Sequence, residues 1–267
     1  MRAHDRSRSL MPSLDEERLQ VALRQCALRS PATGADATAF ERLRRESAEI
    51  LPRLARDLAE GTWRPGPPTL THVSTYTGKQ LEFWLPPVLD QVVHRAVRNA
   101  VDRITETRVL RDWVSGYRPG RSRVTTLRHA ARLHARGLRA VADVEAAPAG
   151  EARLEEVVGW LTPYIRDDAF LTVLRTALSV FPDPTAPGTT LAPMLVNLRL
   201  SRCDTALDGP HMIRFGRTYL AFTTDHGEAE RAFTVIAEAL HTRGLQPHPG
   251  SRVRTAVNVE DLLLNGR

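Results

Sequence analysis

The alternation of short apolar runs with helical segments in the second half of the chain constrains its fold more than any other feature. Residues 138–144 are typical of a buried strand, and residues 212–215 and 219–223 are two short runs flanking a tight hairpin. Helical periodicity precedes the hairpin in residues 191–207 and follows it in residues 228–243. This order predicts a helix-rich α+β fold with a small antiparallel sheet packed on helices.

The first half of the chain is predicted to be mainly helical. A capping box that begins at Ser13 opens a helix, and a linker at residues 30–36 follows that helix. The next helix, kinked near Pro52, ends at Gly61, because glycine is the residue type that most often terminates a helix. Ser122 is the expected cap of a helix rich in arginine.

The composition is that of a folded protein. Apolar residues make up 42% of the 267 residues and charged residues 25%. No window reaches the roughly 18 apolar residues of a transmembrane helix, and no charged-then-apolar signal segment opens the chain. Cys26 and Cys203 lack metal or redox spacing, which favours reduced thiols in the core. We therefore expect a cytoplasmic location and no membrane partner.

Positive charge is concentrated in the first half of the chain. Residues 1–140 hold 25 basic and 15 acidic side chains, and residues 141–267 hold 12 basic and 16 acidic ones. Arg128, Arg132 and Arg136 recur at four-residue spacing, which places them on one helix face. Together with three preceding arginines they predict a phosphate-binding surface for RNA or DNA, although spacing alone also fits a solvated helix face. The three preceding residues are Arg118, Arg121 and Arg123.

Four short motifs occur along the chain in a characteristic order. Residues 61–68 read Gly-Thr-Trp-Arg-Pro-Gly-Pro-Pro, and residues 85–94 read Leu-Pro-Pro-Val-Leu-Asp-Gln-Val-Val-His. Residues 115–122 read Ser-Gly-Tyr-Arg-Pro-Gly-Arg-Ser, and residues 192–198 read Ala-Pro-Met-Leu-Val-Asn-Leu. In this order they resemble the reverse transcriptases of group II intron and bacterial type, over roughly residues 38–265.

The resemblance implies the fingers and palm of a right-hand polymerase. Residues 1–37 are then an appended N-terminal helix and linker, residues 38–140 a fingers-like lobe, and residues 141–267 a palm-like lobe with no thumb after it. A palm without a thumb leaves a sheet edge and an apolar flank uncovered. We therefore expect a homo-oligomer or a protein partner that covers this face.

The hairpin departs from the family at the positions that carry catalysis. Residues 214–219 read Arg-Phe-Gly-Arg-Thr-Tyr, where the family has an aromatic residue, Ala and two Asp. Arg217 and Thr218 thus replace the paired carboxylates that hold two divalent cations, and of the family's carboxylates Asp143 remains. Because a guanidinium is cationic and offers donors only, we expect Mg²⁺ binding to be lost, with no metal site and no cofactor. Since the two positions face each other in the family, Arg217 is expected to pair with Asp143.

Other substrate contacts of the family are also replaced. Its basic fingers residues fall near Thr75 and Leu81, and its late lysine falls near Ser251. Pro148 lies in the segment where the family has a flat aromatic gate against the ribose. These departures lie in several motifs, so enzymatic activity is not expected.

Three functions remain open. The first is a reverse transcriptase-like pseudoenzyme that serves as a nucleic-acid-binding scaffold in a complex, for RNA more than for DNA. The second is a protein-interaction or regulatory subunit with the same fold, for example in phage defence. The third is an active RNA-directed DNA polymerase or nucleotidyl transferase with an unusual site.

Overall fold

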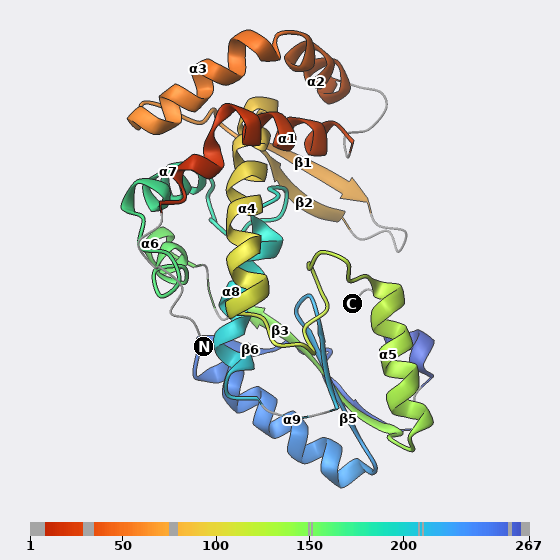
Figure 1. The fold of residues 1–267 in the computed structure, drawn as a ribbon. Coiled ribbons are helices and arrows are strands. Elements are labelled where there is room, and N and C mark those ends of the chain that lie inside the picture. Colours follow the sequence, from red (N-terminus) through yellow and green to blue (C-terminus); the bar gives the residue numbers. More distant parts are fainter. Residues whose placement is uncertain are drawn as a thin grey trace. The chain divides into compact units, whose positions relative to one another are not determined.

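The computed structural model describes residues 9–28, 35–74, 80–148, 150, 152–207, 209, 211–255 and 258–262 (Figure 1). It is a mixed α+β structure whose strands pair in antiparallel ladders, which confirms the α+β class predicted from the alternation of strands and helices. Within the described ranges, no helix is both long enough and apolar enough to cross a bilayer.

The chain divides into two compact units. The first holds residues 1–105 and 152–195, and the second holds residues 106–151 and 196–267. This division differs from the predicted boundary at residue 140, because the segment before that boundary contributes to the sheet of the second unit. Within that segment Val114 forms a bridge to a strand residue, and the following helix packs on the same sheet. The N-terminal helix packs within the first unit.

The first unit is mainly helical, with one two-stranded hairpin. Asp15, and not Ser13, caps the first α-helix by accepting a hydrogen bond from the backbone of Arg18. A break at Glu46 divides the predicted second helix into two, and Gly61 ends the later one with φ 69, as expected for a terminating glycine. The elements are η1 (Met11–Leu14), α1 (Glu16–Ala27), α2 (Ala35–Arg45), α3 (Ser47–Glu60), β1 (Thr69–Ser74), β2 (Gln80–Leu85), α6 (Leu154–Gly159) and α7 (Asp168–Leu178). Two further helices, α4 (Val88–Arg108) and α8 (Ala192–Asp204), begin in the first unit and end in the second.

The second unit contains a five-stranded sheet with strand order β4-β5-β3-β6, in which β7 also pairs with β3. Its strands are β3 (Ala140–Pro148), β4 (Met212–Phe215), β5 (Thr218–Thr223), β6 (Leu245–Pro247) and β7 (Arg252–Arg254). Its other elements are α5 (Arg123–Ala135), α9 (His226–His241) and η2 (Val259–Leu262). The predicted hairpin is therefore the β4–β5 pair, and the predicted central strand is β3.

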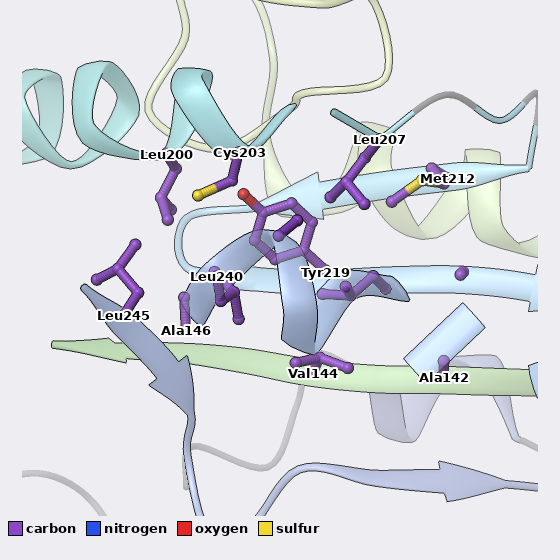
Figure 2. Packing of buried hydrophobic residues seen from close by; sticks show 13 residues of the cluster. Ala142, Val144, Ala146, Leu200, Cys203, Leu207, Met212, Tyr219, Leu240 and Leu245 are labelled. Atoms are coloured by element: carbon purple, nitrogen blue, oxygen red, sulfur yellow. The ribbon is translucent and has the colours of Figure 1, made fainter. Parts of the chain in front are cut away.

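Both faces of this sheet are buried. Successive residues of β3 point to opposite sides, and residues of both sets lie in buried clusters. Ala142 and Val144 pack with Tyr219 and with residues of α8 and α9 (Figure 2). Val141 packs on the opposite face with Leu220, beneath α5 and η2. The sheet thus has α9 on one face and α5 on the other, and the β4–β5 turn projects from one end.

Candidate nucleic-acid interface and the altered hairpin

The predicted hairpin forms, and its turn consists of Gly216 and Arg217. Strands β4 and β5 pair with Phe215 opposite Thr218, which leaves two residues between the strands. Gly216 has φ 60, a left-handed conformation that short hairpins use and that glycine adopts without strain. The Arg217 side chain is half exposed, and its Nη2 lies 3.4 Å from Oε1 of Glu145.

Asp143 pairs with Arg254 and not with Arg217. Nη2 of Arg254 lies 2.8 Å from Oδ2 of Asp143, whose side chain is fully buried. The strand register gives the reason, because Glu145, and not Asp143, lies opposite Thr218 beside the turn. The predicted pair between Asp143 and Arg217 is therefore wrong, and Glu145 is the partner of the hairpin arginine.

The residues around the hairpin do not fit a two-metal centre. The carboxylates of Asp143 and Glu145 each face a guanidinium, and Thr218 brings no charge. Mg²⁺ in proteins is bound through carboxylates and phosphates, and a neighbouring fixed cation opposes its binding. Among the residues that the structure describes, no group of three or more His, Cys, Asp or Glu side chains is placed to hold a metal ion.

A fully buried ion pair lies at the base of the hairpin. Nη2 of Arg214 lies 2.7 Å from Oδ2 of Asp204, and neither side chain is exposed. Nε of Arg214 donates to Oδ1 of Asp204 at 3.1 Å, which makes the pair bidentate. The Tyr219 hydroxyl donates to the same carboxylate at 2.8 Å, and burial raises the pKa of Tyr219, so the hydroxyl keeps its proton. Figure 2 shows the Tyr219 ring among the apolar residues of this core.

The same ion pair joins three segments that are far apart in the sequence. Nη1 of Arg214 donates to Oδ1 of Asn197 and to the carbonyl of Gly216, both at 2.9 Å. Nδ2 of Asn197 in turn donates to the carbonyl of Gly116 at 3.0 Å. A Cβ added at Gly116 would collide with the backbone nitrogen of Gly216, so glycine permits the close approach. The motif before α5, the motif in α8 and the altered hairpin therefore meet in one place.

Sequence reasoning missed this buried network. Asp204 ends a helix, where acidic residues are usually solvated, and nothing in the spacing links it to Arg214. The available signal was Arg214 itself, which lies between Ile213 and Phe215 in a strand predicted to be apolar. A charge in a buried strand requires an internal partner.

Two of the six predicted phosphate-binding arginines have internal hydrogen bonds. Arg118 is buried, contacts both carboxylate oxygens of Glu106 at 2.8–3.1 Å, and donates to the carbonyls of Arg111 and Val114 at 2.8 Å. Arg121 donates to the carbonyl of Val114 at 3.0 Å. Burial, followed by the charge of Arg118, lowers the pKa of Arg121. These two side chains hold the loop before α5.

The other four predicted arginines are exposed on α5 or at its ends. Ser122 and Thr125 form a capping box at the helix start, which confirms the predicted cap. The buried positions of α5 face the sheet, whereas Arg128, Arg132 and Arg136 lie on the exposed side at steps of about 6 Å along the axis. We call these three residues the arginine stripe. Arg123 is exposed at the first turn.

The arginine stripe is exposed and positively charged. In the described part of the chain, none of the stripe residues forms an ion pair with Asp or Glu, whereas Arg118 and Arg175 do. Burial first, and then the charges of Arg132 and Arg121, lower the pKa of His129.

The remaining predicted substrate positions fall in both units of the chain. Leu81 lies in β2 of the first unit and is partly buried, and Thr75 lies outside the described residues. In the second unit Pro148 is exposed at the end of β3. Ser251 Oγ accepts a hydrogen bond from the backbone of Glu145 at 3.0 Å, which is a structural contact between neighbouring strands.

Neither a protein-family model nor a curated protein sequence matches this chain. The likeness to reverse transcriptases therefore depends on the motif residues of the sequence, and we treat it as a proposal.

Proposed function

We propose that this protein is a reverse transcriptase-like pseudoenzyme with a fingers–palm fold that acts as a nucleic-acid-binding scaffold, for RNA more than for DNA. The observation that carries the proposal is the arginine stripe of α5, which is exposed and, among the residues that the structure describes, forms no ion pair with a carboxylate. The preference for RNA comes from the motif resemblance alone.

Electrostatics make the stripe suitable for a phosphate backbone. Each arginine that neutralises a phosphate releases condensed counterions, so affinity falls steeply as salt rises. Guanidinium groups bind phosphate in a bidentate geometry and remain charged at any working pH. The aromatic share of the sequence is 6%, so we expect the backbone contacts to dominate over stacking on bases.

The altered hairpin supports a role without catalysis. The carboxylates near the hairpin are already paired with arginines. Glu145 contacts Arg217, and Asp143 contacts Arg254. Displacing either arginine for a metal ion would leave an unpaired guanidinium close to that ion. Nucleotidyl transfer by two metals is therefore the least favoured of the three functions.

The scaffold proposal is tested by binding measurements at increasing salt. We expect fluorescence anisotropy with a short single-stranded RNA to give a linear fall of log K with log salt from about 50 to about 200 mM. The stripe variant carries Arg128→Ala, Arg132→Ala and Arg136→Ala. Its slope should be smaller in magnitude by about 2, since each single-strand phosphate contact contributes roughly 0.7. The RNA should be titrated against both proteins in the same salt series.

A matched control separates the stripe from net charge. Arg45, Arg53 and Arg56 are exposed on α2 and α3, and their replacement by alanine removes the same number of charges. This control variant should keep the salt slope of the unmodified protein. Equal slopes for all three proteins would contradict the assignment to α5.

A protein-binding role is the second candidate, and one surface feature favours it. An apolar hollow of about 280 Å³ lies where α9 meets β4 and β5, with Met212, Phe222 and Ile236 in its lining. Val235 at this hollow is 51% exposed, which is unusual for a large apolar residue. A protein partner or a second copy of the chain is proposed to cover this face. If salt and the stripe variant leave RNA binding unchanged, this function replaces the first.

A further inference from the structure

His129 lies beside the arginine stripe on α5. It follows Arg128 directly and precedes Arg132 by three residues, a spacing at which helix side chains are neighbours. Its side chain is partly buried, at the border between the exposed stripe and the positions of Ala130 and Leu133, which pack on the sheet. A group that titrates near neutral pH therefore lies at the edge of the proposed phosphate-binding surface.

The charges that act on His129 come from arginines. Residues 113–142 contain several arginines and no Asp or Glu. Arg121 precedes α5, and its guanidinium is held by a hydrogen bond to the carbonyl of Val114 at 3.0 Å. Burial is the largest cause that lowers the pKa of His129, and the charges of Arg132 and Arg121 lower it further. The ring is therefore mainly neutral at pH 7 in the free protein.

The sheet and η2 pack against α5 and bring other charged groups to this side. By strand alternation and register, β3 and β7 place four charged residues on the face next to α5, and η2 adds one that the structure describes. The acids of β3 already have partners, since Asp143 pairs with Arg254 and Glu145 with Arg217. The five charged residues are Asp143, Glu145, Arg252, Arg254 and Asp261.

A phosphate bound at Arg132 changes this balance, because a negative charge nearby favours the protonated ring. We propose that His129 takes up a proton from solvent when a nucleic-acid phosphate binds at the arginine stripe, and that it then serves as a further phosphate contact. The inference rests on the proposed nucleic-acid-binding function and specifies its regulation, since binding strengthens as the pH falls. The protonated ring donates a charge-assisted hydrogen bond to a phosphate oxygen.

The test measures affinity against pH with a ligand whose own charge is constant. A short oligouridylate without terminal phosphates serves, because its phosphodiesters stay anionic and its bases stay neutral between about pH 8 and about pH 6. We expect fluorescence anisotropy to show an affinity that rises as the pH falls over this range, by up to about tenfold, since one unit of pKa corresponds to a factor of ten. The salt slope of the unmodified protein should also be larger in magnitude at the lower pH, by up to about 0.7.

Substitutions on α5 assign the pH dependence to one ring. His129→Gln cannot take up a proton, so it should match the unmodified protein at about pH 8 and lose the gain toward about pH 6. His129→Lys carries a permanent charge and should bind more tightly than the unmodified protein at about pH 8. His134→Gln removes the other partly buried histidine of α5 and should keep the gain.

A titration by NMR needs no substitution, so it applies even if the variants at His129 fail to fold. The pKa of the His129 ring should be higher with the oligouridylate bound than without it, and an equal pKa in both states would overturn the inference. Affinity that is steeply salt-dependent but independent of pH would overturn the proton uptake and leave the scaffold function in place. A gain that persists in His129→Gln would also overturn it. Absence of binding at any pH would overturn the scaffold function and the proton uptake together.

Discussion

A buried ion pair between Arg214 and Asp204 holds the altered hairpin in its position. Arg214 and Asp204 have no exposed side-chain surface, and each is a partner that the other requires. Removing one member leaves a buried charge without compensation, which costs about 3–5 kcal/mol. We therefore predict that Arg214→Met lowers the free energy of unfolding by an amount in this range, as measured by urea denaturation.

The exposed pair on the same hairpin supplies the control for this prediction. Arg217 and Glu145 contact each other in a partly solvated position, where ion pairs contribute about 0–1 kcal/mol. Arg217→Met should therefore change the free energy of unfolding by about 1 kcal/mol or less. Comparable losses in Arg214→Met and Arg217→Met would show that burial of the first pair contributes nothing.

A buried histidine in the first unit makes stability depend on pH. His94 is fully buried, Nδ1 lies 2.7 Å from the Thr189 hydroxyl, and burial lowers the pKa of His94 to about 4. The unfolded chain, with a pKa near 6.5, binds the proton first as pH falls. The stabilising contribution is therefore complete above about pH 6.5 and is lost progressively toward about pH 4, by about 3 kcal/mol in total.

Denaturation at a series of pH values tests this contribution. His94→Gln has no titrating group at this position, so its free energy of unfolding should fall less steeply between about pH 6.5 and about pH 4 than that of the unmodified protein. Parallel pH profiles for the two proteins would show that His94 titrates normally in the folded state.

At the scale of elements, the two glycines in the loop before α5 differ in how much space surrounds them. A Cβ at Gly116 would meet the backbone of Gly216, whereas a Cβ at Gly120 would meet nothing within 4 Å. We predict that Gly116→Ala displaces the hairpin and destabilises the protein by several kcal/mol, because the backbone cannot move without breaking the buried network. Gly120→Ala, at φ 69, should cost about 1 kcal/mol from backbone strain alone. Thermal unfolding of the two variants measures the difference, and equal losses would contradict the close contact.

Local patterns predicted the elements better than their contacts. The hairpin and the cap at Ser122 follow from turn residues and capping chemistry, which act over a few positions, and the structure confirms both. The partner of Asp143 is Arg254, more than a hundred residues away, and the register of two strands decides that contact. The internal role of Arg118 likewise depends on Glu106 and on the loop between them. Sequence spacing does not contain this information.

At the scale of the whole molecule, the position of the charge matters more than its total. The net charge of the chain is +6, which is modest for 267 residues. Several arginines that the sequence offers are consumed by internal partners, as Arg214 is by Asp204. The stripe on α5 remains as a row of exposed cations on one helix. Nucleic-acid binding should therefore be localised there and respond strongly to a few substitutions.

The salt dependence of RNA binding is the most direct test of the arginine stripe as a phosphate-binding surface. We expect log K to fall steeply and linearly with log salt. The slope should be smaller in magnitude by about 2 in the triple alanine variant of Arg128, Arg132 and Arg136. It should be unchanged in the matched variant of Arg45, Arg53 and Arg56. RNA affinity that is independent of salt, or a slope that is the same in all three proteins, would contradict this role of the stripe.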